Sequence, residues 1–211
     1  DIAAIADVRP EAVLLPKVDN AQMIAELGAL MDRHEGFENT QIWTMMETPR
    51  GILNAAEIAD APRMEGMVMG TNDLAKDLNT RFDSARAPLL VALGHCVLAA
   101  KAAGIVIVDG VYNAFKDDVG LQVEAAQGRD MGFDGKTLIH PAQVAITNRV
   151  FAPTDEEIDL SERQIAAFEA ATAEGLGVAV VDGKIVENLH IETARATLAK
   201  AAMIATLEGR A

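Results

Sequence analysis

Five short apolar segments recur along the chain, separated by longer segments with helical spacing. They are "AVLLPKV" (12–18), "QIWTMMET" (41–48), "GMVMGTND" (66–73), "GIVIVDGV" (104–111) and "GKTLIHP" (135–141). Runs this apolar are typical of strands buried on both faces of a sheet. Their period of about 25 to 37 residues is the size of one βα unit. The sequence therefore predicts an α/β fold with parallel strands and right-handed crossovers.

Two architectures are built from such units, an open doubly wound sheet and an eight-stranded TIM barrel. No glycine-rich dinucleotide fingerprint follows any of the five segments. Polar residues cluster where the apolar runs end, as in a barrel whose site lies at the C-terminal ends of the strands: Lys17, Glu47, Asp73, Asp109 and His140. We expect a (β/α)8 barrel of which the last five βα units are visible. Roughly three further strands are then expected before Asp1.

Residues 153–211 depart from the repeating pattern. Thr154 begins a helix, with the glutamate of a capping box three residues later. The segment "GVAVVDGKIVE" (177–187) predicts a hairpin turning on Asp182 and Gly183, and an amphipathic helix follows it. We expect residues 1–152 to form a partial barrel that carries the site. The remainder is expected to be a helix–hairpin–helix lid without a core of its own, packed on the barrel or on another subunit.

Net charge and hydropathy argue against a nucleic-acid-binding protein and against a membrane-spanning one. The net charge of -14 argues against nucleic acid as a partner, because phosphate binding needs a basic face. No apolar run approaches the roughly 18 residues of a membrane span, and no signal-peptide pattern opens the chain. The single Cys96 lies in an Ala/Leu-rich helical segment and is read as a buried small hydrophobe. We expect a cytoplasmic enzyme that acts on a small molecule.

Two carboxylates are expected to meet at neighbouring strand ends. Glu47 and Asp73 are 26 positions apart, which is one βα unit. Converging acids repel each other unless a positive charge lies between them, and Mg²⁺ suits this role because it takes one or two carboxylates and leaves its other positions to water and substrate. In the alternative interpretation each acid caps a helix or pairs with an arginine.

Five motifs that occur in order carry a resemblance to a known family: "LLPKV", "METPRGILNA", "GTNDLAKDL", "DGVYNAFKD" and "GFDGKTLIHPAQV". The set resembles the HpcH/HpaI aldolase and citrate lyase β-subunit (CitE-like) superfamily, in its malyl-CoA lyase and malyl-CoA thioesterase branch. The resemblance implies a TIM barrel that forms homotrimers or homohexamers and binds Mg²⁺ or Mn²⁺. It implies that Glu47 and Asp73 hold the metal. The family's catalytic arginine has no counterpart here, so the chain alone is expected to be catalytically incomplete.

The resemblance also implies an activity. It is a Mg²⁺-dependent lyase that cleaves a 3-hydroxyacyl-CoA thioester such as malyl-CoA to acetyl-CoA and glyoxylate, or runs the reverse condensation. CoA enters as part of the substrate. The residues expected to contact substrate follow the first, third and fifth segments: Lys17, Gly70, Thr71, Asn72, Ile139 and His140.

Glu187 completes the expected catalytic set with Glu47 and Asp73. The resemblance implies that it stands in the hairpin where family lyases carry an aspartate that reaches a neighbour's site as acid or base. Glutamate is one methylene longer, and geometry matters at the ångström level for proton transfer. The departure favours water attack on the thioester instead, as in malyl-CoA thioesterases. Two more hypotheses stay open, a citrate lyase β-like subunit that needs an acyl-carrier partner and an aldolase on free 2-keto acids.

Overall fold

The computed structural model describes residues 1–81, 83 and 85–209 of the chain. It divides into two compact units, Asp1–Phe151 and Ala152–Ala211. Each unit has its own apolar cluster.

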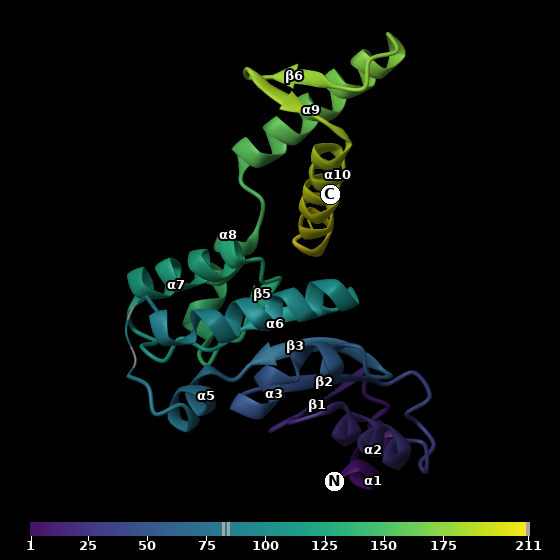
Figure 1. Ribbon diagram of the computed structural model, residues 1–211, viewed down its shortest axis with the longest axis vertical. Helices are drawn as coiled ribbons and strands as arrows, with labels where there is room; N and C mark the ends of the chain where they lie inside the picture. Colours follow the sequence, from purple (N-terminus) through teal and green to yellow (C-terminus); the bar gives the residue numbers. More distant parts are fainter. Residues whose placement is uncertain (82, 84, 210–211) are drawn as a thin grey trace. The chain divides into compact units, whose positions relative to one another are not determined.

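The first unit is built on a parallel sheet of five strands (Figure 1). The strands are β1 (Ala12–Leu15), β2 (Gln41–Met46), β3 (Met64–Met69), β4 (Val106–Asp109) and β5 (Gly135–Lys136). Each strand pairs in parallel with the one that follows it in the chain. A doubly wound sheet reverses its strand order at a switch point, whereas successive neighbours without a reversal are the order of a TIM barrel. Of the two predicted architectures, the strand order therefore favours the barrel.

Helices follow the strands and cover the sheet. Their bounds in this unit are α1 (Ile2–Ile5), α2 (Ala21–Met31), α3 (Pro49–Leu53), α4 (Ala55–Ala59), α5 (Thr71–Asp77), α6 (Leu90–Ala103), α7 (Asp118–Met131) and α8 (Val144–Phe151). Three short 3₁₀ helices complete it: η1 (Ala6–Val8), η2 (Ala87–Leu89) and η3 (Pro141–Gln143). Helix α6 packs against β3, β4 and α4. The core between sheet and helices contains Cys96, which is fully buried as predicted.

The strands differ from the sequence prediction in burial and in length. Residues 66–69 of β3 are buried throughout, as expected for a strand covered on both faces. Strand β2 instead alternates half-buried and buried side chains. The predicted strand 66–73 ends at Met69, because Gly70 and the polar residues after it begin helix α5. The predicted strand 135–141 is reduced to two residues, since the chain then turns into η3 at Pro141.

The second unit contains α9 (Asp155–Ala173), the hairpin β6 (Ala179–Val181) and β7 (Lys184–Val186), and α10 (Asn188–Leu207). Asp182 and Gly183 both have positive φ, at 51° and 74°, as the predicted two-residue turn requires. The capping box of α9 is present as well. The expectation that this segment lacks a core was wrong. Its strands and α10 bury a small cluster that includes Val186 and Ile191, and α9 packs against it.

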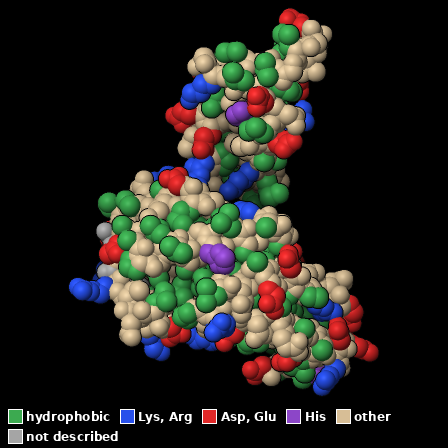
Figure 2. Space-filling view, viewed as in Figure 1, with side chains coloured by type: hydrophobic (Ala, Val, Ile, Leu, Met, Phe, Trp, Pro, Cys, Tyr) green, Lys and Arg blue, Asp and Glu red, His purple; other side chains and the backbone are tan. Residues whose placement is uncertain are grey.

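Within the described part of the chain, no helix is long and apolar enough to cross a membrane. Apolar side chains are nevertheless exposed on α6, where Val91 is 85% and Leu98 73% exposed. Figure 2 shows apolar side chains gathered over this helix. Most of the charged side chains lie elsewhere on the drawn face of the first unit.

Candidate functional site

The glutamate that follows β2 is held by the turn into α3. Thr48 is the N-cap of α3: its Oγ1 accepts the N–H of Gly51 at 2.9 Å and donates to Asp19 Oδ1 at 2.5 Å. A Cβ on Gly51 would lie 2.1 Å from the carbonyl oxygen of Val18, so the turn needs glycine there. The segment "ETPRG" therefore fastens the end of β2 to the loop after β1. This places Glu47 beside that loop.

Glu47 is almost completely buried, with 6% of its surface exposed. Its Oε1 accepts the backbone N–H of Lys17 at 2.9 Å. Its Cβ and Oε2 lie against Gly70, where an added Cβ would be 2.4 Å and 2.6 Å from them. Burial raises the pKa of the Glu47 carboxyl, against the lowering effect of the Lys17 N–H and charge.

Asp73 lies in the first turn of α5 and meets Glu47 at the rim of the sheet. Its Oδ1 is 2.9 Å from Lys17 Nζ, and this ammonium is the main cause that lowers the pKa of the Asp73 carboxyl. The neighbouring Asp73 carboxyl contributes to the raised pKa of Glu47, and Glu47 contributes to the lowered pKa of Asp73. The structure therefore brings Lys17, Glu47, Gly70 and Asp73 together. The two acids converge, and the positive charge beside them is Lys17.

The donor set fits a hard divalent cation. The two acids offer carboxylate oxygens, the ligands that Mg²⁺ prefers. Among the described residues, no group of three or more His, Cys, Asp or Glu side chains could hold a metal ion. Mg²⁺ is commonly bound by one or two protein carboxylates, with its other positions left to water and ligand. This arrangement suits zinc poorly, because zinc takes three or four ligands that are mostly nitrogen or sulfur. Glu47 and Asp73 would hold the ion.

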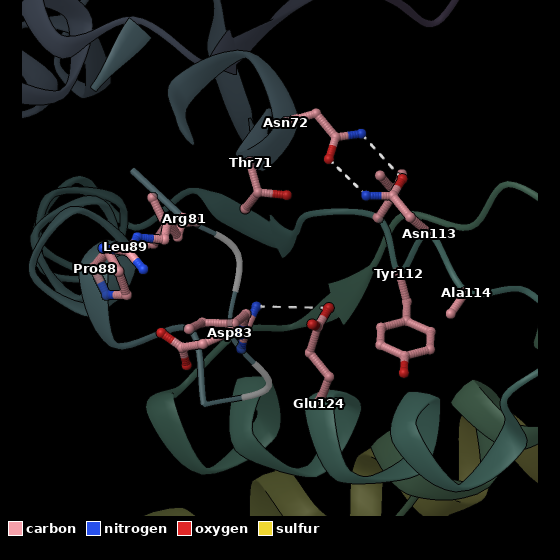
Figure 3. Close-up of a pocket in the computed structure, with 12 residues that line it drawn as sticks. Thr71, Asn72, Arg81, Asp83, Pro88, Leu89, Tyr112, Asn113, Ala114 and Glu124 are labelled. Atoms are coloured by element: carbon pink, nitrogen blue, oxygen red, sulfur yellow. Dashed lines mark hydrogen bonds and ion pairs between the residues drawn. The ribbon is translucent and has the colours of Figure 1, made fainter. Parts of the chain in front are cut away.

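The first residues of α5 border a cavity next to the acids. Thr71 and Asn72 line it together with Tyr112 and Asn113, which follow β4, and its volume is about 450 Å³. Two hydrogen bonds join the amides: Asn72 Nδ2 donates to Asn113 Oδ1 at 3.1 Å, and Asn113 Nδ2 donates to Asn72 Oδ1 at 2.7 Å (Figure 3). Asn113 had no assigned role in the sequence analysis. Its partner is 41 positions away, so no local pattern indicates the contact.

Ile139 and His140 lie at the end of the fifth strand, outside the acid cluster. Ile139 is 51% exposed and its N–H donates to Gln143 Oε1. The His140 ring stacks on Phe115 with centroids 4.9 Å apart, and its Nδ1 accepts the N–H of Ala142. In the described part of the chain, no hydrogen bond or ion pair that the structure records joins either residue to the two acids.

Asp109, the last residue of β4, faces α7 and belongs to a buried charge cluster. Both of its oxygens accept from Arg86 Nη1, at 2.7 Å and 2.8 Å, and Lys136 Nζ is 3.2 Å from Oδ2. Lys136 also contacts Glu124 at 2.6 Å. The cluster balances two positive and two negative charges inside the protein. It is structural. The roles of Arg86 and Lys136 could not be read from a local pattern, because Asp109 lies 23 and 27 positions from them.

Glu187 lies in the second unit, at the N-cap of α10. Its N–H donates to His190 Nδ1 at 3.1 Å, and the residue is exposed. Its role as acid or base stays a prediction.

Known proteins resemble this chain over most of its length. The model of the family described as HpcH/HpaI aldolase/citrate lyase matches residues 1–141. A (3S)-malyl-CoA thioesterase of Cereibacter sphaeroides is 59% identical over 205 residues, covering 97% of this chain and 70% of the relative. The citrate lyase subunit beta of Escherichia coli is 37% identical over 207 residues, covering 95% of this chain and 68% of the relative.

A solved structure agrees with these sequence matches. CitE from Mycobacterium tuberculosis, in complex with magnesium, acetoacetate and coenzyme A, superimposes with a TM-score of 0.74 at 28% identity. The match covers 91% of this chain and 68% of that one. The chain belongs to the HpcH/HpaI aldolase/citrate lyase family.

Proposed function

We propose that this protein hydrolyses the thioester of a 3-hydroxyacyl-CoA such as malyl-CoA, and that it needs a divalent metal. The observation that carries the proposal is the 59% identity to a (3S)-malyl-CoA thioesterase across 97% of the chain, compared with 37% to a citrate lyase subunit beta. The sequence motifs alone favoured the lyase over the thioesterase. The higher identity to the thioesterase supports the reverse order.

Glu47 and Asp73 supply the metal ligands of this proposal. A Mg²⁺ or Mn²⁺ ion bound there would act as a Lewis acid toward oxygens of the ligand. Burial of Glu47 excludes water from one side of the carboxylate and holds it in one position against Gly70. Gly70 carries no side chain, and this leaves the room that the Glu47 side chain occupies beside it.

Hydrolysis breaks the carbon–sulfur bond and forms a carbon–oxygen bond, so malyl-CoA and water give malate and free CoA. One proton must leave the attacking water, and one must reach the departing sulfur. We propose Glu187 of a neighbouring subunit for this proton transfer, because the family resemblance puts it at the position of the aspartate that serves as acid or base in lyases. Lys17, Thr71 and Asn72 are proposed to bind the acyl part, and Ile139 and His140 the CoA part, at the ends of β1, β3 and β5.

Product analysis of the intact protein with malyl-CoA and Mg²⁺ tests the proposal. A thioesterase releases free thiol and malate, whereas a lyase releases glyoxylate and acetyl-CoA without free thiol. Glyoxylate without thiol would refute the hydrolase and restore the lyase. A requirement for an acyl-carrier protein would identify a citrate lyase β-like subunit, and turnover of 2-keto acids without CoA would identify an aldolase.

The metal ligands have a separate test. Glu47→Gln keeps the size of the side chain and removes its charge, so metal-dependent turnover should be lost while the circular dichroism spectrum is unchanged. Glu57→Gln, on the exposed side of α4, is the matched control and should retain activity. Full activity in Glu47→Gln would refute the metal assignment.

Assembly as a homotrimer or homohexamer stays a prediction from the family resemblance. Light scattering after gel filtration measures it directly.

A further inference from the structure

Lys17 makes two different contacts with the acid pair. Its backbone N–H donates to Glu47 Oε1, and its side-chain ammonium lies 2.9 Å from Asp73 Oδ1. We propose that the Lys17 ammonium is a built-in counter-ion of the acid pair, and that a divalent cation must displace it from Asp73 to bind. This inference rests on the metal site of the proposed function and adds a residue that sets its affinity.

The charge of the acid pair requires such a partner. Glu47 is buried, and Lys17 contacts both Glu47 and Asp73, so the metal-free protein holds two carboxylates close together. Among the ion pairs recorded for residues 1–81, 83 and 85–209, the one with Lys17 is the pair that reaches these acids. The ammonium therefore offsets the repulsion when no metal is present.

The ion pair between Lys17 and Asp73 is exposed enough for a cation to replace the ammonium. The Lys17 side chain is 50% exposed and that of Asp73 is 43% exposed, so water competes for both groups. A lysine side chain is a point charge on a flexible four-carbon stem and can leave without disturbing the core. The N–H of Lys17 stays on Glu47 when this happens, because it belongs to the backbone.

A metal ion on both acids needs the Asp73 oxygen that Lys17 holds, and it repels the ammonium. The two cations therefore compete for one carboxylate. The displaced ammonium remains close to the site, because its backbone is fixed to Glu47, and it can then receive an anionic group of a ligand. Metal binding would in this way prepare Lys17 for the ligand, and the coupling between the two is reciprocal.

Lys17→Met tests the inference because it removes the ammonium and retains the N–H to Glu47. Lys76→Met is the matched control: Lys76, on α5, also lowers the pKa of Asp73 by its charge but makes no recorded bridge to it. Mn²⁺ binding is measured by calorimetry on the full chain without acyl-CoA, at low and at high salt. We expect the Kd of Lys17→Met to fall about two- to fivefold at low salt, the range that an exposed ion pair supports. The Kd of Lys76→Met for Mn²⁺ should change less. High salt should reduce the difference in Kd between Lys17→Met and wild type, because it screens exposed charges.

A second readout is the shift of the unfolding midpoint. Saturating Mn²⁺ should raise the midpoint more in Lys17→Met than in wild type, because the metal-free variant has lost its counter-ion. Lys17→Gln, which keeps a polar side chain without charge, repeats the measurement if the methionine variant does not fold.

The outcomes separate the two proposals. If Lys17→Met binds Mn²⁺ as wild type does, or more weakly, the counter-ion inference is overturned while the metal site stands. If Glu47→Gln leaves the Mn²⁺ affinity of wild type unchanged, the metal site of the proposed function fails.

Discussion

The contact between Glu47 and Gly70 gives a sharp prediction for the variant Gly70→Ala. A Cβ at position 70 would lie 2.4 Å from Glu47 Cβ and 2.6 Å from Oε2. Carbon atoms pack at about 3.5–4.0 Å, so the carbons must separate by about 1.1–1.6 Å. Glu47 is buried and its Oε1 is bound to Lys17 N at 2.9 Å, so this movement breaks the bond. We expect a loss of about 1–3 kcal/mol in the free energy of unfolding, the usual cost of overpacking.

Urea unfolding followed by the fluorescence of Trp43, the only tryptophan, measures this loss. Mn²⁺ affinity should fall about tenfold or more, as when residues that support a metal ligand are changed. Gly94→Ala is the control, because a Cβ there meets nothing within 4 Å. Because Gly94 lies in the middle of α6, Gly94→Ala should raise the free energy of unfolding by about 0.5–1 kcal/mol. Wild-type stability and Mn²⁺ affinity in Gly70→Ala would refute the argument that Gly70 positions Glu47.

Three further predictions concern other residues. Asp109→Asn removes the carboxylate that contacts both buried cations of the cluster, Arg86 and Lys136, and we expect a loss of about 3–5 kcal/mol in the free energy of unfolding, measured with urea; a loss below about 1 kcal/mol would contradict the buried cluster. The only tyrosine, Tyr112, donates to Asp117, which raises the pKa of Tyr112 to about 12. The folded chain then holds this proton more tightly than the unfolded chain, so the stabilisation is present below about pH 10 and is lost as the pH rises toward 12. Tyrosinate absorbance should therefore appear at lower pH in Asp117→Asn; identical titrations would refute the contact. Burial raises the pKa of the Cys96 thiol to about 12, so a thiol reagent at neutral pH should label it only after unfolding; rapid labelling of the native protein would contradict this.

The sequence predicted the positions of the strands well, because a short apolar run between helical segments is a local signal. The five apolar runs became five parallel strands, and the Asp182–Gly183 turn and the capping box at Thr154 were found where their motifs stand. The ends of strands were predicted less well. The predicted strand 66–73 extended over Gly70 to Asp73, but helix α5 begins at Thr71. Periodicity indicates that an element exists more reliably than it marks the residue at which one element ends and the next begins.

The acid pair was predictable from one βα spacing, but its counter-ion was not. Lys17 lies 30 positions from Glu47, and its N–H reaches the carboxylate from a residue with a φ of 54°. A positive φ at lysine leaves no mark in the sequence. Arg86, Lys136 and Asn113 were missed for the same reason, since their partners are set by tertiary packing.

The amide pair between Asn72 and Asn113 has a consequence for how the rim responds to its surroundings. Each amide satisfies a donor and an acceptor of the other, and neither group ionises. This bridge between the first turn of α5 and the loop after β4 is therefore insensitive to pH and ionic strength, whereas the ion pair between Lys17 and Asp73 weakens as salt is added. Raising the salt concentration should thus weaken the contact between Lys17 and Asp73 and leave the amide pair, which holds α5 to the loop after β4, unchanged.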